Sequence, residues 1–190
     1  MQFQAIVSRL AALALFFVSF SMLVHAAPTL DTRDIGTGPC SGGCNAGDQL
    51  VLTLKELKLG LTANVGNIGK SRHSTTYVVA CTAAIQTAVA DVIRIEQDTT
   101  DAINAKATEV AALLAVIINT TAQGLYAASG KITLQVFLGL VQQTDAALKA
   151  LIVAVLNLIA AVVTFLGASV DAVKLAKVGL NACLNILGLN

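Results

Sequence analysis

The chain has 190 residues, of which 56% are hydrophobic and 12% are charged, and its formal net charge is +1. A nearly neutral chain has no electrostatic footprint for nucleic acid or an anionic lipid surface, so neither is expected as a charge-driven partner. Trp is absent and aromatic residues make up only 4%, which disfavours a sugar-stacking cleft and predicts an aliphatic core of closely spaced helices.

Residues 1–26 have the pattern of a secretory signal peptide. Arg9 is the positive flank, residues 10–24 form an apolar run, and the small residues ending at Ala26 fit a cleavage site. Cleavage after residue 26 of 190 leaves 164 residues, enough for one domain with a single core. We therefore expect a secreted, extracellular protein that begins at Ala27, with eleven basic and eleven acidic residues.

Four cysteines follow the signal peptide: Cys40, Cys44, Cys81 and Cys183. An even number in an oxidising compartment predicts two disulfides, although three connectivities are open. We favour the pairing in which the two N-terminal cysteines bridge outward, one to Cys81 and the other to Cys183. A zinc site is disfavoured because the spacing lacks two CxxC knuckles, and no metal or other cofactor is expected.

Residues 27–47 contain Gly and Pro but few apolar side chains, so we expect an irregular segment there. Residues 48–190 are expected to form an all-α, disulfide-tied helical bundle of about four to five helices. Leucines at helical spacing predict a first helix over 48–62, followed by a glycine-containing linker. Ser74 or Thr75 is expected to cap the next helix.

An amphipathic helix is predicted over 76–95, with Thr87 and Asp91 on the face opposite the apolar side chains. Residues 96–101 break this pattern. We interpret them as a turn between helices, or as a helical stretch that projects beyond the core, in preference to a functional carboxylate cluster. A further helix is expected to follow and to end at Gly130.

Residues 150–170 include no charged side chain, and such a stretch is long enough to cross a bilayer. Two interpretations are open: a membrane span, or a helix inside a soluble bundle. The direction of the polar residues favours the bundle. At 100° per residue, Asp145, Lys149, Asn157 and Thr164 fall within one narrow arc.

The same arc continues on both sides of that stretch, through Lys131, Gln135, Gln142, Asp171, Lys174, Asn181 and Asn185. A span surrounded by lipid has no reason to keep such a polar stripe, whereas a helix with one wet edge does. A single helix over the whole stripe would be too long for a compact domain of this size. A break near Gly139 or Gly167 is therefore expected.

Three sequence motifs would indicate a ligand site, a catalytic site or a modification site. The first two functions are disfavoured, and the third is left open. Residues 64–71 nearly match the phosphate loop GxxxxGK[ST], but the first position is Asn64 and a helix precedes it, so a flexible linker is favoured. His73 is the only histidine after the signal peptide, which favours an exposed linker position over a metal ligand or a member of a catalytic triad. Asn119 opens an N-glycosylation sequon, and modification and non-modification are both open.

Residues 84–117, "AIQTAVADVIRIEQDTTDAINAKATEVAALLAVI", follow a signal peptide in a chain that is rich in Ala, Val, Thr and Leu. This stretch resembles fungal small secreted proteins of the hydrophobic surface binding and cell-wall mannoprotein type. The resemblance implies a helical fold, association with walls or apolar surfaces, and lipid binding in some members. The four cysteines and the apolar C-terminal half depart from that pattern, so no functional residue is carried over.

We therefore expect a secreted, non-catalytic helical protein that binds an apolar surface, lipid or a protein partner outside the cell, as a cell-wall or effector-like protein. No catalytic residue is assigned, and oligomer formation is left open. The alternative is a membrane-anchored or pore-forming protein that uses residues 150–170. A hydrolase is a distant third hypothesis.

Overall fold

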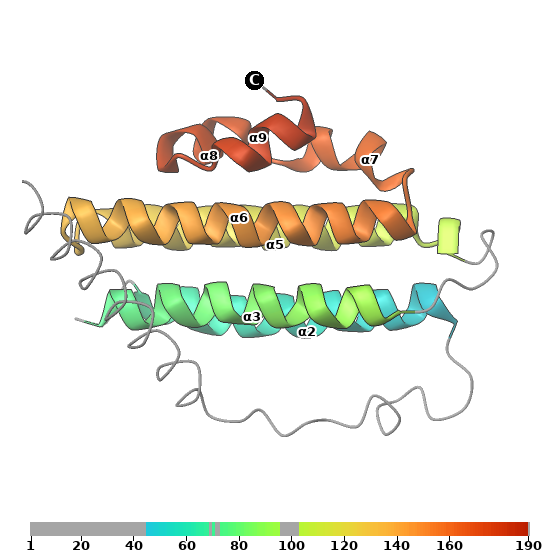
Figure 1. Cartoon of the computed structure of the whole chain (residues 1–190), viewed down its shortest axis with the longest axis horizontal. Coiled ribbons are helices and arrows are strands. Elements are labelled where there is room, and N and C mark those ends of the chain that lie inside the picture. Colours follow the sequence, from blue (N-terminus) through green and yellow to red (C-terminus); the bar gives the residue numbers. More distant parts are fainter. Residues whose placement is uncertain (1–44, 69, 71–72, 96–102, 190) are drawn as a thin grey trace, which may run out of the picture. The chain divides into compact units, whose positions relative to one another are not determined.

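The computed structural model describes residues 45–68, 70, 73–95 and 103–189, all within the unit Gly43–Asn190. Among these residues the secondary structure is helical and no strand occurs (Figure 1). The helices are α2 (Ala46–Ile68), α3 (Ser74–Arg94), α5 (Ala107–Ser129), α6 (Leu134–Leu158), α7 (Val162–Ser169), α8 (Ala172–Val178) and α9 (Asn181–Leu187). The predicted all-α class is confirmed. The predicted count of four to five helices is too low, because the chain after α6 forms three short helices.

Several sequence predictions fall on residues outside this description. They are the signal peptide, the segment 27–44 with Cys40 and Cys44, and the stretch 96–101. The boundary of the helical domain can be compared with the structure, because α2 already begins at Ala46, two residues before the expected start.

The first helix also extends beyond its predicted C-terminus. Its N-terminus is capped by Asn45, whose Oδ1 accepts a hydrogen bond of 2.9 Å from the backbone N–H of Asp48. The periodic leucines that predicted the helix are all buried: Leu50, Leu54, Leu57 and Leu61. The helix then continues beyond Thr62, through Gly66, to the buried Ile68. Packing of this last turn against α5 outweighs the low helix propensity of glycine.

The start of α3 differs from the prediction. His73 occupies the N-cap position without a side-chain capping bond, and Ser74 is already helical. The buried Ser74 hydroxyl donates instead to the carbonyl oxygen of Ile68, at 3.3 Å. Ser74 therefore ties the end of α2 to the start of α3 and does not cap the helix. At its other end α3 stops at Arg94, before the stretch 96–101.

The helices pack in pairs. α2 lies beside α3, α2 packs on α5, and α3 packs on α6, while α7 and α8 contact α5 and α9 contacts α6 (Figure 1). α2 and α5 run in the same direction, since Lys106 meets Asp48 at their N-terminal ends and Gly124 meets Val65 near their C-terminal ends. The core is aliphatic, as predicted: the largest fully buried side chains are all leucines and isoleucines.

Residues 150–170 do not form one helix. α6 ends at Leu158, Ile159 leaves the helical conformation with φ −137° and ψ 88°, and α7 begins at Val162. Ile159 and Val162 are both fully buried, so the chain turns to bring these two side chains into the core. The break was expected at a glycine, but Gly139 lies inside α6 and Gly167 lies inside α7.

The predicted polar stripe follows the water-facing side of the bundle with one exception. Lys149, Asn157 and Thr164 are exposed, as are Lys131, Gln135, Gln142, Asp171, Asn181 and Asn185, and Lys174 is half-buried. Asp145 was predicted to share this edge and does not: it is buried, with 8% of its surface exposed. The stripe therefore predicts the solvent-facing side correctly except at Asp145, which is buried because it binds backbone N–H groups of α9.

Three helices, α3, α5 and α6, are long and apolar enough to cross a membrane by length and composition alone. Within the bundle, 56% of the most apolar window of α5 and 50% of that of α6 are buried against other helices, compared with 33% for α3. Much of the high hydropathy of α5 and α6 is thus accounted for by their contacts with neighbouring helices.

Candidate functional site

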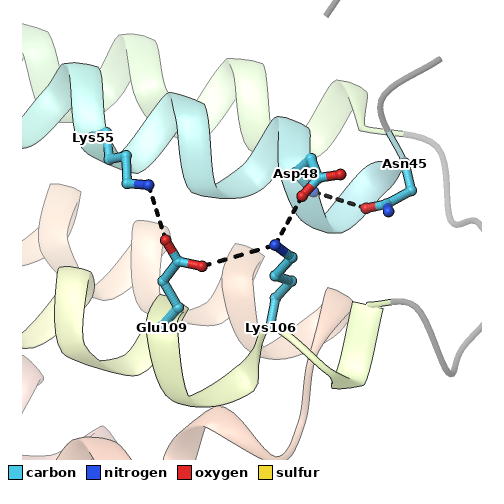
Figure 2. Close-up of polar contacts among 5 residues, drawn as sticks. All are labelled: Asn45, Asp48, Lys55, Lys106 and Glu109. Carbon is cyan, nitrogen blue, oxygen red and sulfur yellow. Dashed lines mark hydrogen bonds and ion pairs between the residues drawn. The ribbon is translucent and has the colours of Figure 1, made fainter.

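The N-terminal ends of α2 and α5 are joined by a chain of ion pairs (Figure 2). Lys106 Nζ lies 2.9 Å from Asp48 Oδ1 and 3.9 Å from Glu109 Oε2. Lys55 Nζ lies 2.9 Å from Glu109 Oε1. The four charges alternate in sign, so each carboxylate of this cluster faces an ammonium group.

These ion pairs hold the two helix ends together and offer little chemistry. Asp48 accepts a hydrogen bond from Lys106, and this bond, the Asp48 charge and the nearby Glu109 charge raise the pKa of the Lys106 ammonium above its usual value. The side chains are 33 to 51% exposed, so water screens these pairs and each contributes little to stability. In the described part of the chain, no group of three or more His, Cys, Asp or Glu residues is placed to hold a metal ion.

Asp145 is the buried carboxylate of the bundle, and it binds the start of α9. Its Oδ2 accepts a hydrogen bond of 2.7 Å from the backbone N–H of Ala182, and its Oδ1 accepts one of 3.0 Å from that of Cys183. These N–H groups belong to the first turn of α9, where no intrahelical acceptor is available. Asp145 on α6 therefore caps a helix that follows it by 37 residues in the chain.

The two cysteines among the described residues are buried and carry free thiols. Desolvation raises the pKa of the Cys81 thiol to about 12. Burial raises the pKa of the Cys183 thiol as well, and the adjacent Asp145 reinforces the effect. Such thiols are poor nucleophiles and poor metal ligands. No disulfide joins Cys81 to Cys183, and the predicted pairing with Cys40 and Cys44 involves residues outside the description.

Asn119, the sequon residue, connects α5 to the segment between α7 and α8. Its Nδ2 donates to the carbonyl oxygen of Ser169 at 3.1 Å, and its Oδ1 accepts from the backbone N–H of Asp171 at 3.0 Å. The hydroxyl of Thr121, the third sequon residue, is buried and donates to the carbonyl oxygen of Ile117. The sequon thus has a structural role, and glycosylation of Asn119 stays a prediction.

The near match to a phosphate loop lacks the required backbone. Residues 64–68 are the last turn of α2, whereas a phosphate loop connects a strand to a helix. The expected flexible linker is also shorter than predicted, since α2 ends only at Ile68 and α3 begins at Ser74. His73 is exposed, as predicted, at the N-terminus of α3.

A further feature is the set of large apolar side chains that stay exposed. Among the described residues there are eleven: Leu59, Ile93, Val116, Tyr126, Leu134, Val136, Leu138, Val153, Val163, Phe165 and Val173. Four of the eleven fall between residues 126 and 138, at the end of α5 and the start of α6. The sequence is 56% hydrophobic, but its pattern did not predict this location, because helical periodicity does not show where a neighbouring helix ends.

Comparison with family models, curated proteins and solved structures finds no match to this chain.

Proposed function

We propose that this chain is a secreted, non-catalytic helical protein that binds an apolar surface or lipid outside the cell. The observation that carries this proposal is the exposure of large apolar side chains after the core is complete. Leu134 is 72% exposed, Tyr126 61% and Leu138 52%, all between residues 126 and 138. Single exposed apolar residues are normal on protein surfaces, but a group of them marks a contact surface.

A binding role also fits the use of the carboxylates in the bundle. Asp48 and Glu109 are engaged by lysines, and Asp145 is engaged by the first turn of α9. A general acid or base needs a carboxylate that can reach a substrate proton. These three carboxylates are instead committed to contacts that hold helices together. Secretion is proposed from residues 1–26, which have a signal-peptide pattern.

Adsorption to an apolar interface tests this proposal. We would float the secreted protein with vesicles made of equal parts phosphatidylcholine and phosphatidylglycerol, and measure the tension of a triglyceride–water interface as protein is added. Co-flotation or a fall in interfacial tension is the expected result. A native mass spectrum of the exported chain would show copurified lipid directly. Absence of adsorption in both assays would overturn the proposal.

The second candidate is a membrane-anchored protein, and the observation in its favour is the length and apolar composition of α3, α5 and α6. In the bundle, residues 150–170 do not form one straight helix, because the chain leaves the helical conformation at Ile159. Washing membranes with alkaline carbonate separates the two candidates. A surface-bound bundle is released into the supernatant, whereas a spanning protein stays in the pellet.

A further inference from the structure

The end of α2 and the connection from α5 to α6 lie side by side at one end of the bundle. They are joined by Lys131, whose Nζ donates to the carbonyl oxygen of Ile68 at 3.2 Å. The helices leading into them also touch, since Gly124 of α5 packs against Val65 of α2. We call this region the turn end and define it by Lys70, Tyr126, Lys131, Leu134, Val136 and Leu138.

The turn end carries exposed apolar side chains. Leu134 is 72% exposed, Tyr126 61%, Leu138 52% and Val136 47%. Leu134 and Leu138 are four residues apart on α6, so they lie on the same side of that helix. Tyrosine has an apolar ring and a polar hydroxyl, and it is typical of surfaces that enter the boundary between lipid headgroups and acyl chains, where the ring is buried and the hydroxyl stays wet.

The helix segments next to the turn end carry no negative charge. Residues 57–90, in α2 and α3, contain no Asp or Glu, and neither do residues 110–144, in α5 and α6. The described basic residues in these two stretches are Lys58, Lys70 and Lys131. Lys70 and Lys131 are exposed at the turns themselves.

None of the described carboxylates of the same four helices lies at the turn end: Glu56 and Asp145 are in the middle of α2 and α6, and the others lie at the opposite end. Asp48 and Glu109 lie in the first turns of α2 and α5, and Asp91 lies near the end of α3. At that end the carboxylates are paired with cations: Asp48 with Lys106, and Asp91 with Arg94. The near-zero net charge of the chain therefore hides a local excess of positive charge at the turn end, where lysines and exposed apolar groups occur without carboxylates.

We propose that the turn end is the lipid-contact site of this protein and that it docks on a bilayer rich in anionic headgroups. This inference rests on the proposed function and gives it a location and a lipid class. Leu134, Leu138 and Tyr126 enter the boundary of the acyl chains, and Lys70 and Lys131 meet lipid phosphates. It revises the exclusion of an anionic lipid surface drawn from net charge alone, because attraction depends on local charge.

The apolar part of the proposal is tested by vesicle flotation of two matched double variants. Leu134→Ser with Leu138→Ser removes the apolar contact at the turn end. Leu59→Ser with Ile93→Ser removes two side chains of similar exposure elsewhere, so it controls for a general loss of surface hydrophobicity. We expect the first pair to lose at least about tenfold in affinity and the second to change by less than about twofold. Equal losses in both, or no loss in the first, would overturn the site.

The charge part is tested with Lys70→Gln and, as a control away from the turns, Lys149→Gln. We expect about fivefold weaker binding for Lys70→Gln on vesicles of equal parts phosphatidylcholine and phosphatidylglycerol, and no change for Lys149→Gln. Binding that is equally tight on pure phosphatidylcholine would overturn the anionic preference. Adsorption to the triglyceride interface without binding to any vesicle would overturn the bilayer site and leave the proposed function standing. Circular dichroism of each variant confirms that its helices are intact.

Discussion

The sharpest test of the bundle compares two valines on α6 that are two residues apart. Val155 is fully buried, whereas Val153 is 37% exposed. Replacing each with Asp introduces the same carboxyl group at nearly the same position along the helix. In the bundle the two positions are very different environments, whereas a lipid-surrounded helix would expose both to hydrocarbon.

The expected effect of Val155→Asp is large. Losing the buried side chain costs about 1.5 kcal/mol or more. Burying a carboxyl group without a partner costs at least about 2 kcal/mol, and protonating it at neutral pH adds about 4 kcal/mol, from its ordinary pKa of about 3.9. Partial relaxation toward water lowers this sum, so we expect a loss of about 4 kcal/mol or more, against a typical total stability of about 5 to 15 kcal/mol.

Val153→Asp should cost only about 1 kcal/mol, because water can solvate the new charge. Asn157→Asp, at an exposed position on the same helix, should change stability by about 0.5 kcal/mol or less. The assay is the yield of soluble protein, followed by urea unfolding of each purified variant. We expect the yield of Val155→Asp to fall sharply and the yields of the other two variants to stay normal. Equal damage from all three would refute the assignment of this helix face to the core.

Three other predictions follow from single contacts. Gly124→Ala should destabilise the protein by about 1 kcal/mol in urea unfolding, because its Cβ would lie 2.7 Å from a methyl group of Val65 on α2. Gly139→Ala is the control: its Cβ would meet open space, so it should stabilise the protein by about 0.5 to 1 kcal/mol. Asp145→Ala should lower stability by about 2 to 3 kcal/mol and loosen α9, seen as faster amide exchange there, and unchanged exchange would contradict the capping role. Alkylation of the native protein at pH 8 should leave Cys81 and Cys183 unlabelled, since burial raises both pKa values and keeps the thiols neutral. Alkylation after unfolding without reductant should label both, and labelling of either residue in the native protein would contradict its burial.

Much of the helical architecture can be predicted from the sequence, because helical periodicity records which face of each helix avoids water. The leucines of α2 predicted a buried stripe, and all four are buried. The polar residues around 150–170 predicted a wet edge, and Lys149, Asn157 and Thr164 are exposed. The lack of Trp predicted the aliphatic core. These properties depend on residues that are close together in the chain, so the local sequence pattern is enough to predict them.

Other features depend on which segments meet in space, and only the tertiary structure decided them. Asp145 follows the polar stripe in sequence but is buried, because the first turn of α9 brings N–H groups that need an acceptor. The chain breaks at Ile159, where no glycine or proline stands, because burying Ile159 and Val162 outweighs continuing the helix. The turn end exists because α2 and α5 run parallel, which brings the end of α2 next to the connection from α5 to α6. Such contacts join residues 37 to 63 positions apart, and no local pattern encodes them.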